Sequence, residues 1–322
     1  MRRRDFVMLL ATASLARPHI ARAQQSGIPV LGILGTSKER DQYLWQRFGG
    51  YLRALGWEDD RNIRIIRRWP ERSGDDMSEL ARDLVAQGAT VLFAAGGNPA
   101  IRAAQKATSS LPIIGMTDDM VGSGLVANLA RPGGNTTGVS ILASELNVKR
   151  LELLHELLPQ AHSVAILADP TSISSRTQLE GAAQELDMKL FFHAAASRDE
   201  IHAEIAKIAV ERMQAVNILA SPILNDGRTL IIERLAEAAI PAIYQWPETA
   251  EEGGLMAYGP RWALCTRHAA VLIDKVLHGS KPADLPVEQP NIFTLAINLK
   301  TAKRLGLPIP PGLLLRADEV IE

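Results

Sequence analysis

The sequence contains a single cysteine, Cys265, among its 322 residues. An intramolecular disulfide is therefore excluded, and so is a zinc site built from cysteines. Cys265 lies in a stretch with helical pattern, residues 262–266, where we expect it to fill buried space rather than act as a nucleophile. The seven histidines are scattered without a short-spaced pair. We predict no metal site and no cofactor.

Sequence motifs that mark common catalytic sites are also missing. The chain has no G-x-S-x-G nucleophile elbow, no H-E-x-x-H zinc motif and no P-loop. The dinucleotide fingerprint G-x-G-x-x-G is absent too, so a nicotinamide cofactor gains no support. We predict no catalytic residues and a protein that is not an enzyme.

Neither an excess of positive charge nor a membrane-spanning hydrophobic run is present. The formal net charge is −1, whereas nucleic-acid binding asks for a basic face. The apolar run at residues 6–16 has 11 residues, well short of the ~20 that cross a bilayer. The charge argues against a nucleic-acid partner, and the short apolar run argues against an uncleaved membrane anchor.

Residues 1–23 have the order of a secretory signal peptide. Arginines at positions 2–4 precede the apolar run, and Ala21-Arg22-Ala23 matches the A-x-A cleavage pattern. Residues 3–6, R-R-D-F, resemble a twin-arginine signal, with an ordinary Sec signal as the alternative. Cleavage after Ala23 would leave 299 residues with a net charge of −5, because the leader carries five Arg and one Asp. The sequence predicts export to the periplasm.

Short apolar runs alternate with amphipathic helical stretches, and this pattern occurs twice. The first set has expected strands at 28–34, 63–66, 90–94 and 112–116 and helices at 43–55, 77–86 and 98–108. The second set has expected strands at 163–167, 189–192, 216–220 and 241–244 and helices at 176–186, 198–212 and 226–238. Strands that alternate with helices form parallel sheets with right-handed crossovers. The pattern predicts an α/β protein with two doubly wound, Rossmann-like lobes.

The boundary between these lobes falls near residue 140. We place lobe 1 at residues 24–140 and lobe 2 at 141–259, with a Pro- and Gly-rich turn or crossing at 131–135. Residues 260–322 do not begin a third set, so part of them should complete lobe 1 while the remainder crosses back between the lobes. Ligands of doubly wound sheets lie outside the carboxyl ends of the strands. Two facing lobes therefore predict one cleft that closes by a hinge motion.

Six motifs carry a family resemblance across the chain. They are R-P-G-G-N-T-T-G-V at 131–139, L-E-L-L-H-E-L-L-P at 151–159, K-P-A-D-L-P-V-E at 281–288, L-A-I-N-L-K-T-A at 295–302, L-G-L-P-I-P-P at 305–311 and R-A-D-E-V-I at 316–321. The chain resembles the ABC transporter substrate-binding proteins whose members bind tryptophan or tyrosine. In this sequence Met120 stands where that family usually has proline. The resemblance implies a type I periplasmic-binding fold and a permease partner in the inner membrane.

Small and polar residues follow the expected strands of lobe 1. Thr36 and Ser37 place hydroxyl groups after the first strand. Gly97 and Asn98 open a helix after the third strand, with Asn98 as the expected N-cap and Pro99 at the first helical position. Glycine permits close backbone approach, and the free N–H groups of a helix start suit a carboxylate or phosphate. We expect these residues to contact a ligand, with a purely structural turn and cap as the alternative.

Two adjacent acids, Asp118 and Asp119, follow the fourth strand of lobe 1. A carboxylate in a closed cleft would bind an amino group strongly, and each acid is also suited to closing a turn. A catalytic dyad is disfavoured because neighbours in an extended chain point in opposite directions.

Lobe 2 offers Thr171 and Ser172 after its first strand, Ser221 after its third and Trp246 after its fourth. The hydroxyl groups either bind the ligand or cap the next helix. Trp246 either stacks on a flat part of the ligand or packs beneath the cleft.

These features predict a monomer that captures an amino acid or related small carboxylate by lobe closure and delivers it to an ABC permease. The alternatives are a two-lobe enzyme acting on a small sugar or nucleotide, with catalytic residues from distant loops, and a periplasmic sensor accessory. A transcriptional regulator of the same fold is disfavoured by the export signal and by the lack of an N-terminal helix-turn-helix.

Overall fold

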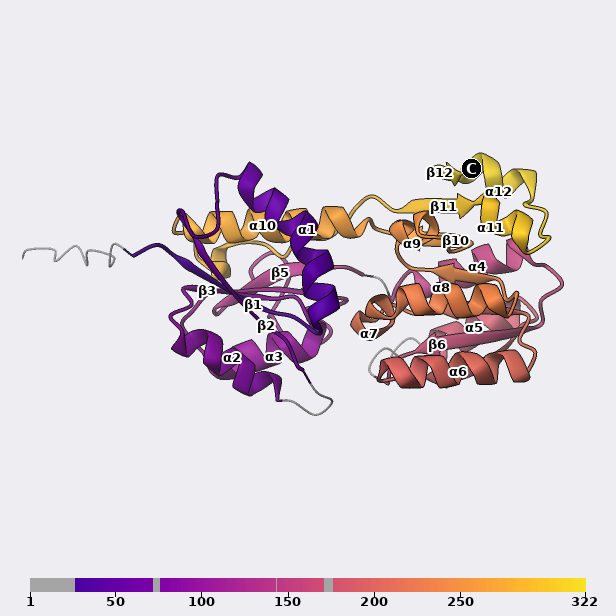
Figure 1. Ribbon diagram of the computed structural model, residues 1–322, viewed down its shortest axis with the longest axis horizontal. Coiled ribbons are helices and arrows are strands. Elements are labelled where there is room, and N and C mark those ends of the chain that lie inside the picture. The colour runs from indigo at the N-terminus through magenta and orange to yellow at the C-terminus, as the bar shows by residue number, and fades with distance from the viewer. Residues whose placement is uncertain (1–26, 72–75, 143, 171–175) are drawn as a thin grey trace, which may run out of the picture.

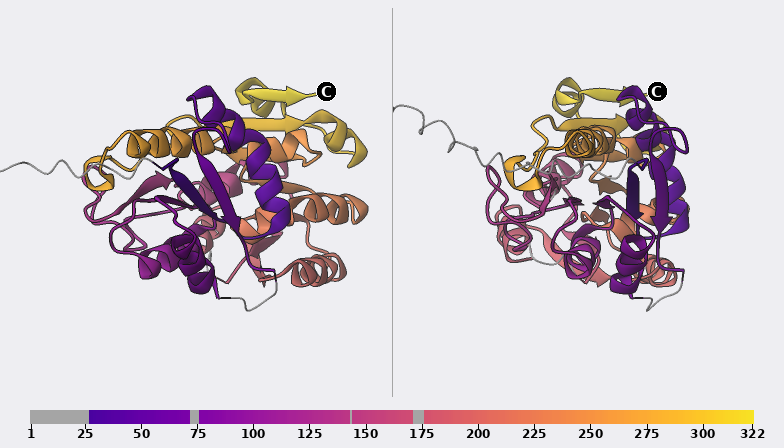
Figure 2. Two further views of the ribbon diagram at one scale, coloured as in Figure 1. Left: turned by 60° about the vertical axis from the view of Figure 1, so that its left-hand side comes forward. Right: turned by 90° about the vertical axis from the view of Figure 1, so that its left-hand side faces the viewer.

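The computed structural model describes residues 27–71, 76–142, 144–170 and 176–322. The predicted signal peptide, Thr171 and Ser172 lie outside the described residues. The described chain forms two lobes, each with a largely parallel sheet between layers of helices (Figures 1 and 2). The predicted fold class, two doubly wound α/β lobes, is confirmed.

Lobe 1 is built on a five-stranded parallel sheet with the order β2-β1-β3-β4-β5. Its strands are β1 (Val30–Leu34), β2 (Arg64–Arg68), β3 (Val91–Ala94), β4 (Ile113–Thr117) and β5 (Thr136–Ser140). Helices α1 (Lys38–Ala54) and α10 (Trp262–Leu277) cover one face, and α2 (Met77–Ala86) and α3 (Gly97–Ala107) cover the other. Strands β1, β3 and β4 and the edge strand β5 are buried throughout. Burial on both faces is why the apolar runs of β1, β3 and β4 are continuous rather than alternating.

Lobe 2 is built on a seven-stranded sheet with the order β12-β11-β10-β9-β8-β6-β7. Its strands are β6 (Ser163–Ala168), β7 (Lys189–Ala194), β8 (Ala215–Ile218), β9 (Ala242–Tyr244), β10 (Met256–Gly259), β11 (Thr294–Asn298) and β12 (Glu319–Ile321). Its helices are α4 (Asn147–Leu157), α5 (Arg176–Glu185), α6 (Arg198–Val210), α7 (Pro222–Asp226), α8 (Arg228–Glu237), α9 (Pro247–Glu251), α11 (Leu299–Arg304) and α12 (Pro311–Arg316). Two separate apolar clusters fill the two faces of this sheet, one under α4 and α5 and one under α6 and α8.

Side-chain caps fix several helix starts. Asp76 accepts a hydrogen bond from Ser78 N at the start of α2, and Ser197 accepts one from Glu200 N at α6. Asn298 accepts one from Thr301 N at the start of α11. Each cap satisfies a backbone N–H that has no partner within the helix.

Three segments of the described chain connect the lobes. The first, described at residues 141–142 and 144–146, lies between β5 and α4. Residues 260–261 run from β10 to α10, and residues 289–293 run from the edge of lobe 1 to β11. The last segment leaves lobe 1 beside β5, where Ser140 N donates to Glu288 O over 2.9 Å. Helix α10 therefore returns to lobe 1 although it follows a strand of lobe 2 (Figure 1).

The structure differs from the expected elements in three places. The Pro- and Gly-rich stretch 131–135 is a turn that leads into β5, a strand that the apolar pattern did not predict. One helix was expected at 226–238, but the structure has α7 and α8, separated at Gly227. Strand β11 pairs antiparallel with β10.

Two absences apply to the described ranges. No helix there combines the length and the apolar character needed to cross a bilayer. Within the same ranges, no three His, Cys, Asp or Glu side chains are grouped so that they could hold a metal ion.

Candidate ligand-binding cleft

The carboxyl ends of the two sheets face each other. In lobe 1 the loops after β1, β3 and β4 lie at this edge, and in lobe 2 the loops after β8 and β9 do. We refer to the space between these loops as the cleft. Parallel strands bring all their carboxyl ends to one edge of a sheet, which is where doubly wound folds bind ligands.

Direct hydrogen bonds join the lobes across the cleft. Thr36 Oγ1 donates to Asp226 Oδ2 over 2.8 Å, and Ser37 Oγ donates to the same oxygen over 3.2 Å. Thr36 and Ser37 follow β1 in lobe 1, whereas Asp226 ends α7 in lobe 2. The structure is therefore closed at this point of the cleft.

Gly97 lies at a second contact between the lobes. Its φ is +70°, and a Cβ added there would be 3.2 Å from Pro222 Cγ at the start of α7. Any larger residue at position 97 would be strained and would press on α7. Glycine thus permits lobe 1 to approach lobe 2 closely.

Asn98 does not cap α3, so that prediction is wrong. The helix begins at Gly97, and its N-cap is Gly96, which makes no side-chain capping bond. The Asn98 amide instead donates from Nδ2 to Ser123 Oγ over 2.9 Å and accepts from Thr117 Oγ1 over 2.6 Å. Asn98 therefore connects α3 to the end of β4 and to the next loop.

The two adjacent acids have separate backbone partners. Asp118 Oδ1 accepts from Ser144 N over 2.9 Å, and its other oxygen accepts from the Ser144 hydroxyl. Asp119 Oδ1 accepts from the N–H groups of Val121 and Gly122 over 3.0 and 2.8 Å. Asp118 anchors the first crossing segment, and Asp119 closes a turn.

The predicted residues of lobe 2 lie at the ends of β8 and β9. Ser221 Oγ accepts from Leu224 N over 3.3 Å and caps α7. Trp246 is 5% exposed and packs edge-on against Trp262, with ring centroids 4.9 Å apart. Its indole nitrogen is buried and has no hydrogen-bond partner among the described residues. The structure thus brings Thr36, Ser37, Gly97, Ser221 and Trp246 to the facing edges of the two lobes.

Arg150 and Asp226 also lie at the cleft, although the sequence did not single them out. Arg150 of α4 is fully buried and donates to Tyr258 O over 3.1 Å and to the Asn147 side chain. Burial lowers the pKa of Arg150 to about 10, and the charge of Asp118 in lobe 1 acts in the opposite direction. The sequence held a signal for Asp226, because a capping serine followed by proline, as in Ser221-Pro222, usually marks the start of a helix. A short helix predicted from this signal would have ended near Asp226.

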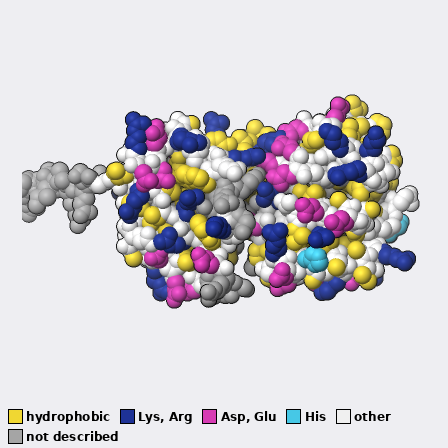
Figure 3. All heavy atoms as spheres, in the orientation of Figure 1, with side chains coloured by type: hydrophobic (Ala, Val, Ile, Leu, Met, Phe, Trp, Pro, Cys, Tyr) yellow, Lys and Arg dark blue, Asp and Glu magenta, His cyan; other side chains and the backbone are white. Residues whose placement is uncertain are grey.

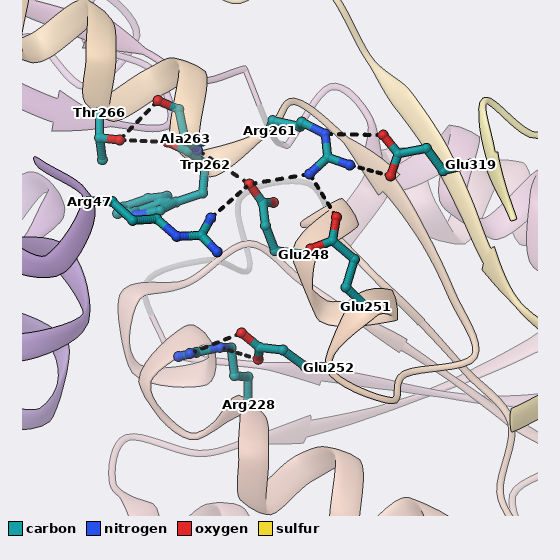
Figure 4. Close-up of polar contacts among 10 residues, drawn as sticks. All are labelled: Arg47, Arg228, Glu248, Glu251, Glu252, Arg261, Trp262, Ala263, Thr266 and Glu319. Atoms are coloured by element: carbon teal, nitrogen blue, oxygen red, sulfur yellow. Dashed lines mark hydrogen bonds and ion pairs between the residues drawn. The ribbon is translucent and has the colours of Figure 1, made fainter. Parts of the chain in front are cut away.

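A charged cluster lies where the crossing segments meet (Figure 4). Glu248 of α9 is 3% exposed and accepts from Ala263 N at the start of α10 over 3.3 Å. One of its oxygens lies 3.9 Å from Arg47 of lobe 1 and 3.9 Å from Arg261, which also pairs with Glu319. Burial raises the pKa of Glu248. Charges of both signs gather at this part of the junction in Figure 3.

Two hollows lie on lobe 2, on opposite edges of its sheet. The larger, of about 620 Å³, lies at the amino ends of β6 and β7, beside His162 and Lys189, away from the cleft. The smaller, of about 20 Å³, lies between α7 and the end of β9 and is lined in part by Asn225, Gln245 and Trp246. The smaller one borders the cleft, because α7 also carries Asp226.

Comparison with known proteins identifies the relatives of this architecture. The family model described as "ABC transporter substrate binding protein" matches residues 45–321. A tyrosine-binding protein of Clostridioides difficile strain R20291 is 25% identical over 267 residues, which cover 80% of this chain and 76% of the relative.

Solved structures agree with this family match. A crystal structure of an ABC domain in complex with L-Trp from Streptococcus pneumoniae has a TM-score of 0.79 at 25% identity and covers 92% of this chain and 100% of that one. A conserved domain protein from Vibrio cholerae O1 biovar eltor has a TM-score of 0.81 at 23% identity and covers 91% of this chain and 100% of that one. The resemblance that the sequence motifs indicated is confirmed.

Proposed function

The chain belongs to the ABC transporter substrate-binding protein family, and we propose that it captures an amino acid or related small carboxylate in the periplasm for an ABC importer. Proteins of this family bind small ligands, and two of the three relatives described above are a tyrosine-binding protein and a protein in complex with L-Trp. Residues 1–23 have the signal-peptide order that this location requires. A permease in the inner membrane would be the partner, and the binding protein would act as a monomer.

The observation that carries this proposal is the bond between the lobes. Asp226 in lobe 2 accepts hydrogen bonds from Thr36 and Ser37 in lobe 1, and these groups can meet only when the lobes are closed. A ligand held between the lobes gains contacts from both, so its binding favours the closed arrangement. Capture then consists of binding to the open form followed by closure, with no covalent step.

The polar groups around the cleft support a ligand that carries both charge signs. The N-terminal end of α3, at Gly97, carries the partial positive charge of a helix start, and Arg150 adds a buried guanidinium. Asp118 and Asp226 supply carboxylates at the same edges. Trp246 provides an apolar surface between the lobes. An α-amino acid matches this combination of groups.

A thermal-shift screen tests the proposal. The purified protein would be unfolded and refolded to remove bound solute and then mixed with amino acids, aromatic acids, sugars and nucleosides. Binding to the folded state alone raises the melting temperature by mass action. We expect a shift with amino acids and full recovery of the compound. Consumption of the compound would favour the two-lobe enzyme, and a shift only with sugars or nucleosides would contradict the proposed cargo.

A further inference from the structure

We infer that Leu142 is a positioning residue of lobe closure, whose left-handed backbone is strained in the closed arrangement and relaxes as the lobes open. The strain opposes closure in the absence of ligand and is overcome when a ligand adds contacts from both lobes. This inference rests on the proposed capture by closure. It begins from the φ of Leu142, which is 57° in the stretch between β5 and α4.

Leu142 differs from the other residues that share its conformation. Four more non-glycine residues of the described chain have a φ between 53° and 59°. Asp187, Arg212 and Ala239 each lie two residues after a helix, where a left-handed residue commonly ends the helix. Asp60 lies in a turn. Leu142 instead follows a strand, and its bulky side chain makes a left-handed backbone unfavourable.

Hydrogen bonds to lobe 1 impose this conformation. Ile141 N donates to Thr117 O over 2.9 Å, so the pairing with β4 continues past the end of β5. Leu142 N donates to Asp118 O over the same distance, and Asp118 Oδ1 accepts from Ser144 N over 2.9 Å. Asp118 thus holds the chain at Leu142 and again two residues later. A strained φ persists only where the surroundings impose it, and these bonds supply the constraint.

Bonds within lobe 2 begin directly afterwards. Helix α4 starts at Asn147, whose carbonyl accepts from Asn217 Nδ2 of β8 over 3.3 Å. Arg150, in the first turn of α4, donates to Tyr258 O of β10 over 3.1 Å. The chain therefore passes from the bonds of lobe 1 to those of lobe 2 between Ser144 and Asn147.

The stretch between these two sets of bonds must absorb any change in the relative position of the lobes. Hinges of domain closure are a few residues that take up large changes in φ and ψ. In this structure the lobes are joined across the cleft by the hydrogen bonds of Asp226. When the lobes separate, α4 moves away from Asp118, Ser144 is released and Leu142 returns to a negative φ.

The strain lowers ligand affinity by a definite factor. A ligand must supply the free energy that closure costs, so its apparent affinity falls with the fraction of protein in the closed form. A left-handed conformation costs a residue with a side chain about 1–2 kcal/mol, which corresponds to a factor of about 5 to 30 in an equilibrium constant. Removal of this cost should tighten binding by that factor.

Replacement of Leu142 by glycine and by alanine separates the effect of the backbone from that of the side chain. Both variants lose the leucine side chain, but only glycine adopts the left-handed conformation without cost. Calorimetry on the protein produced from the full chain would use L-tryptophan, L-tyrosine and the compound that most raises the melting temperature. We expect Leu142→Gly to bind about 5- to 30-fold more tightly than Leu142→Ala, mainly through slower dissociation. Leu142→Asn should lie between them, because asparagine tolerates this conformation.

Small-angle X-ray scattering of the ligand-free protein gives a second readout that needs no ligand. We expect a smaller radius of gyration for Leu142→Gly than for Leu142→Ala, because a larger share of the molecules is closed. Ala239→Gly is the matched control, since Ala239 has a φ of 53° and is exposed after the end of α8, away from the crossing segments. It should leave both the affinity and the radius unchanged.

Equal affinities of Leu142→Gly and Leu142→Ala would overturn the inference even if their melting temperatures differed, because the strain would then be the same with the lobes open or closed. Tighter binding by Leu142→Ala would overturn it too, as would an equal gain in affinity from Ala239→Gly. If no compound binds, the proposed capture fails and scattering alone decides. A smaller radius for Leu142→Gly would then support the role of Leu142 in closure, and equal radii would overturn it.

Discussion

Gly97 shows how one residue controls the distance between the lobes. A residue with a side chain pays about 1–2 kcal/mol to adopt its φ of +70°. A Cβ added at this position would also lie only 3.2 Å from Pro222 Cγ. We predict that Gly97→Ala lowers the free energy of unfolding by about that amount and weakens ligand binding, because the closed form must shift α7. Chemical denaturation and calorimetry measure the two effects.

Gly50 provides the comparison for that substitution. It lies inside α1, has an ordinary helical φ and would have nothing within 4 Å of an added Cβ. Gly50→Ala should therefore stabilise the protein by about 0.5–1 kcal/mol and leave binding unchanged. If Gly97→Ala behaved like Gly50→Ala, the close approach at Pro222 would have no role in closure.

Cys265 reports on unfolding rather than on chemistry. Its side chain is fully buried, and burial together with the nearby charge of Glu248 raises the thiol pKa to about 12. Because the thiolate is the reactive form, we predict that a disulfide reagent at pH 8 leaves the folded protein unmodified and labels it only as it unfolds. Added ligand should slow the labelling. Rapid labelling of the native protein, as fast as for free cysteine, would contradict the buried position.

At the scale of elements, apolar runs predicted strands and helices well, whereas polar segments did not. Strand β5 reads T-T-G-V-S and looks like a loop, yet all five residues are buried. Its hydroxyl groups are satisfied by distant carbonyls, from Thr137 Oγ1 to Leu285 O over 2.8 Å and from Ser140 Oγ to Asp118 O over 3.0 Å. Such partners are up to 148 residues apart, and no local pattern contains them.

The cleft shows the same limit. Strand ends located Thr36, Ser37, Gly97, Ser221 and Trp246 correctly at the facing edges, because parallel topology follows from the order of elements. The partners of Thr36 and Ser37 depend on how the lobes approach each other, so their bonds to Asp226 were not predictable. Asn98 was misassigned for a local reason, since Gly97 already begins α3 in a conformation that only glycine adopts easily.

The buried Glu248 of α9 makes the stability of the folded protein depend on pH. Burial raises its pKa in the folded state above the unfolded value of about 4.3. As pH rises from that value, the unfolded chain loses the proton first, so the contribution of Glu248 to stability falls until the folded group has ionised as well. We predict that Glu248→Gln removes this decline. Melting curves from pH 4 upward should show the variant gaining on wild type as pH rises.

Arg47 is the internal check on that interpretation. It is the partner of Glu248 from lobe 1, at 3.9 Å, and its side chain is 41% exposed. A largely solvated guanidinium at that distance is well screened and attracts the carboxylate only weakly, so Arg47→Gln should leave the pH dependence in place. If Arg47→Gln abolished it, the attraction between the lobes, and not the burial of Glu248, would be the cause.

At the scale of the whole molecule, crossing segments join the two lobes, and the hydrogen bonds of Asp226 join them again across the cleft. Leu142 in the first segment has a φ of 57°, a left-handed conformation that is rare for leucine. Such strain is retained only where the surroundings impose it. Here Leu142 N donates to Asp118 O over 2.9 Å, so the first crossing segment is anchored to lobe 1 at the same residue that holds Ser144.

Asp226 should then determine the lifetime of the captured ligand. Its hydrogen bonds with Thr36 and Ser37 join the two lobes, and Asp226 is partly exposed, so we assign these bonds about 1–2 kcal/mol together. Asp226→Ala should raise the dissociation rate of the ligand about 5- to 30-fold and leave the association rate nearly unchanged, since the open form is untouched. A double-mutant cycle with Thr36→Val isolates the bond, because the two losses should be less than additive. Additive losses, or a change confined to association, would mean that Asp226 acts on the ligand itself and that closure depends on other contacts.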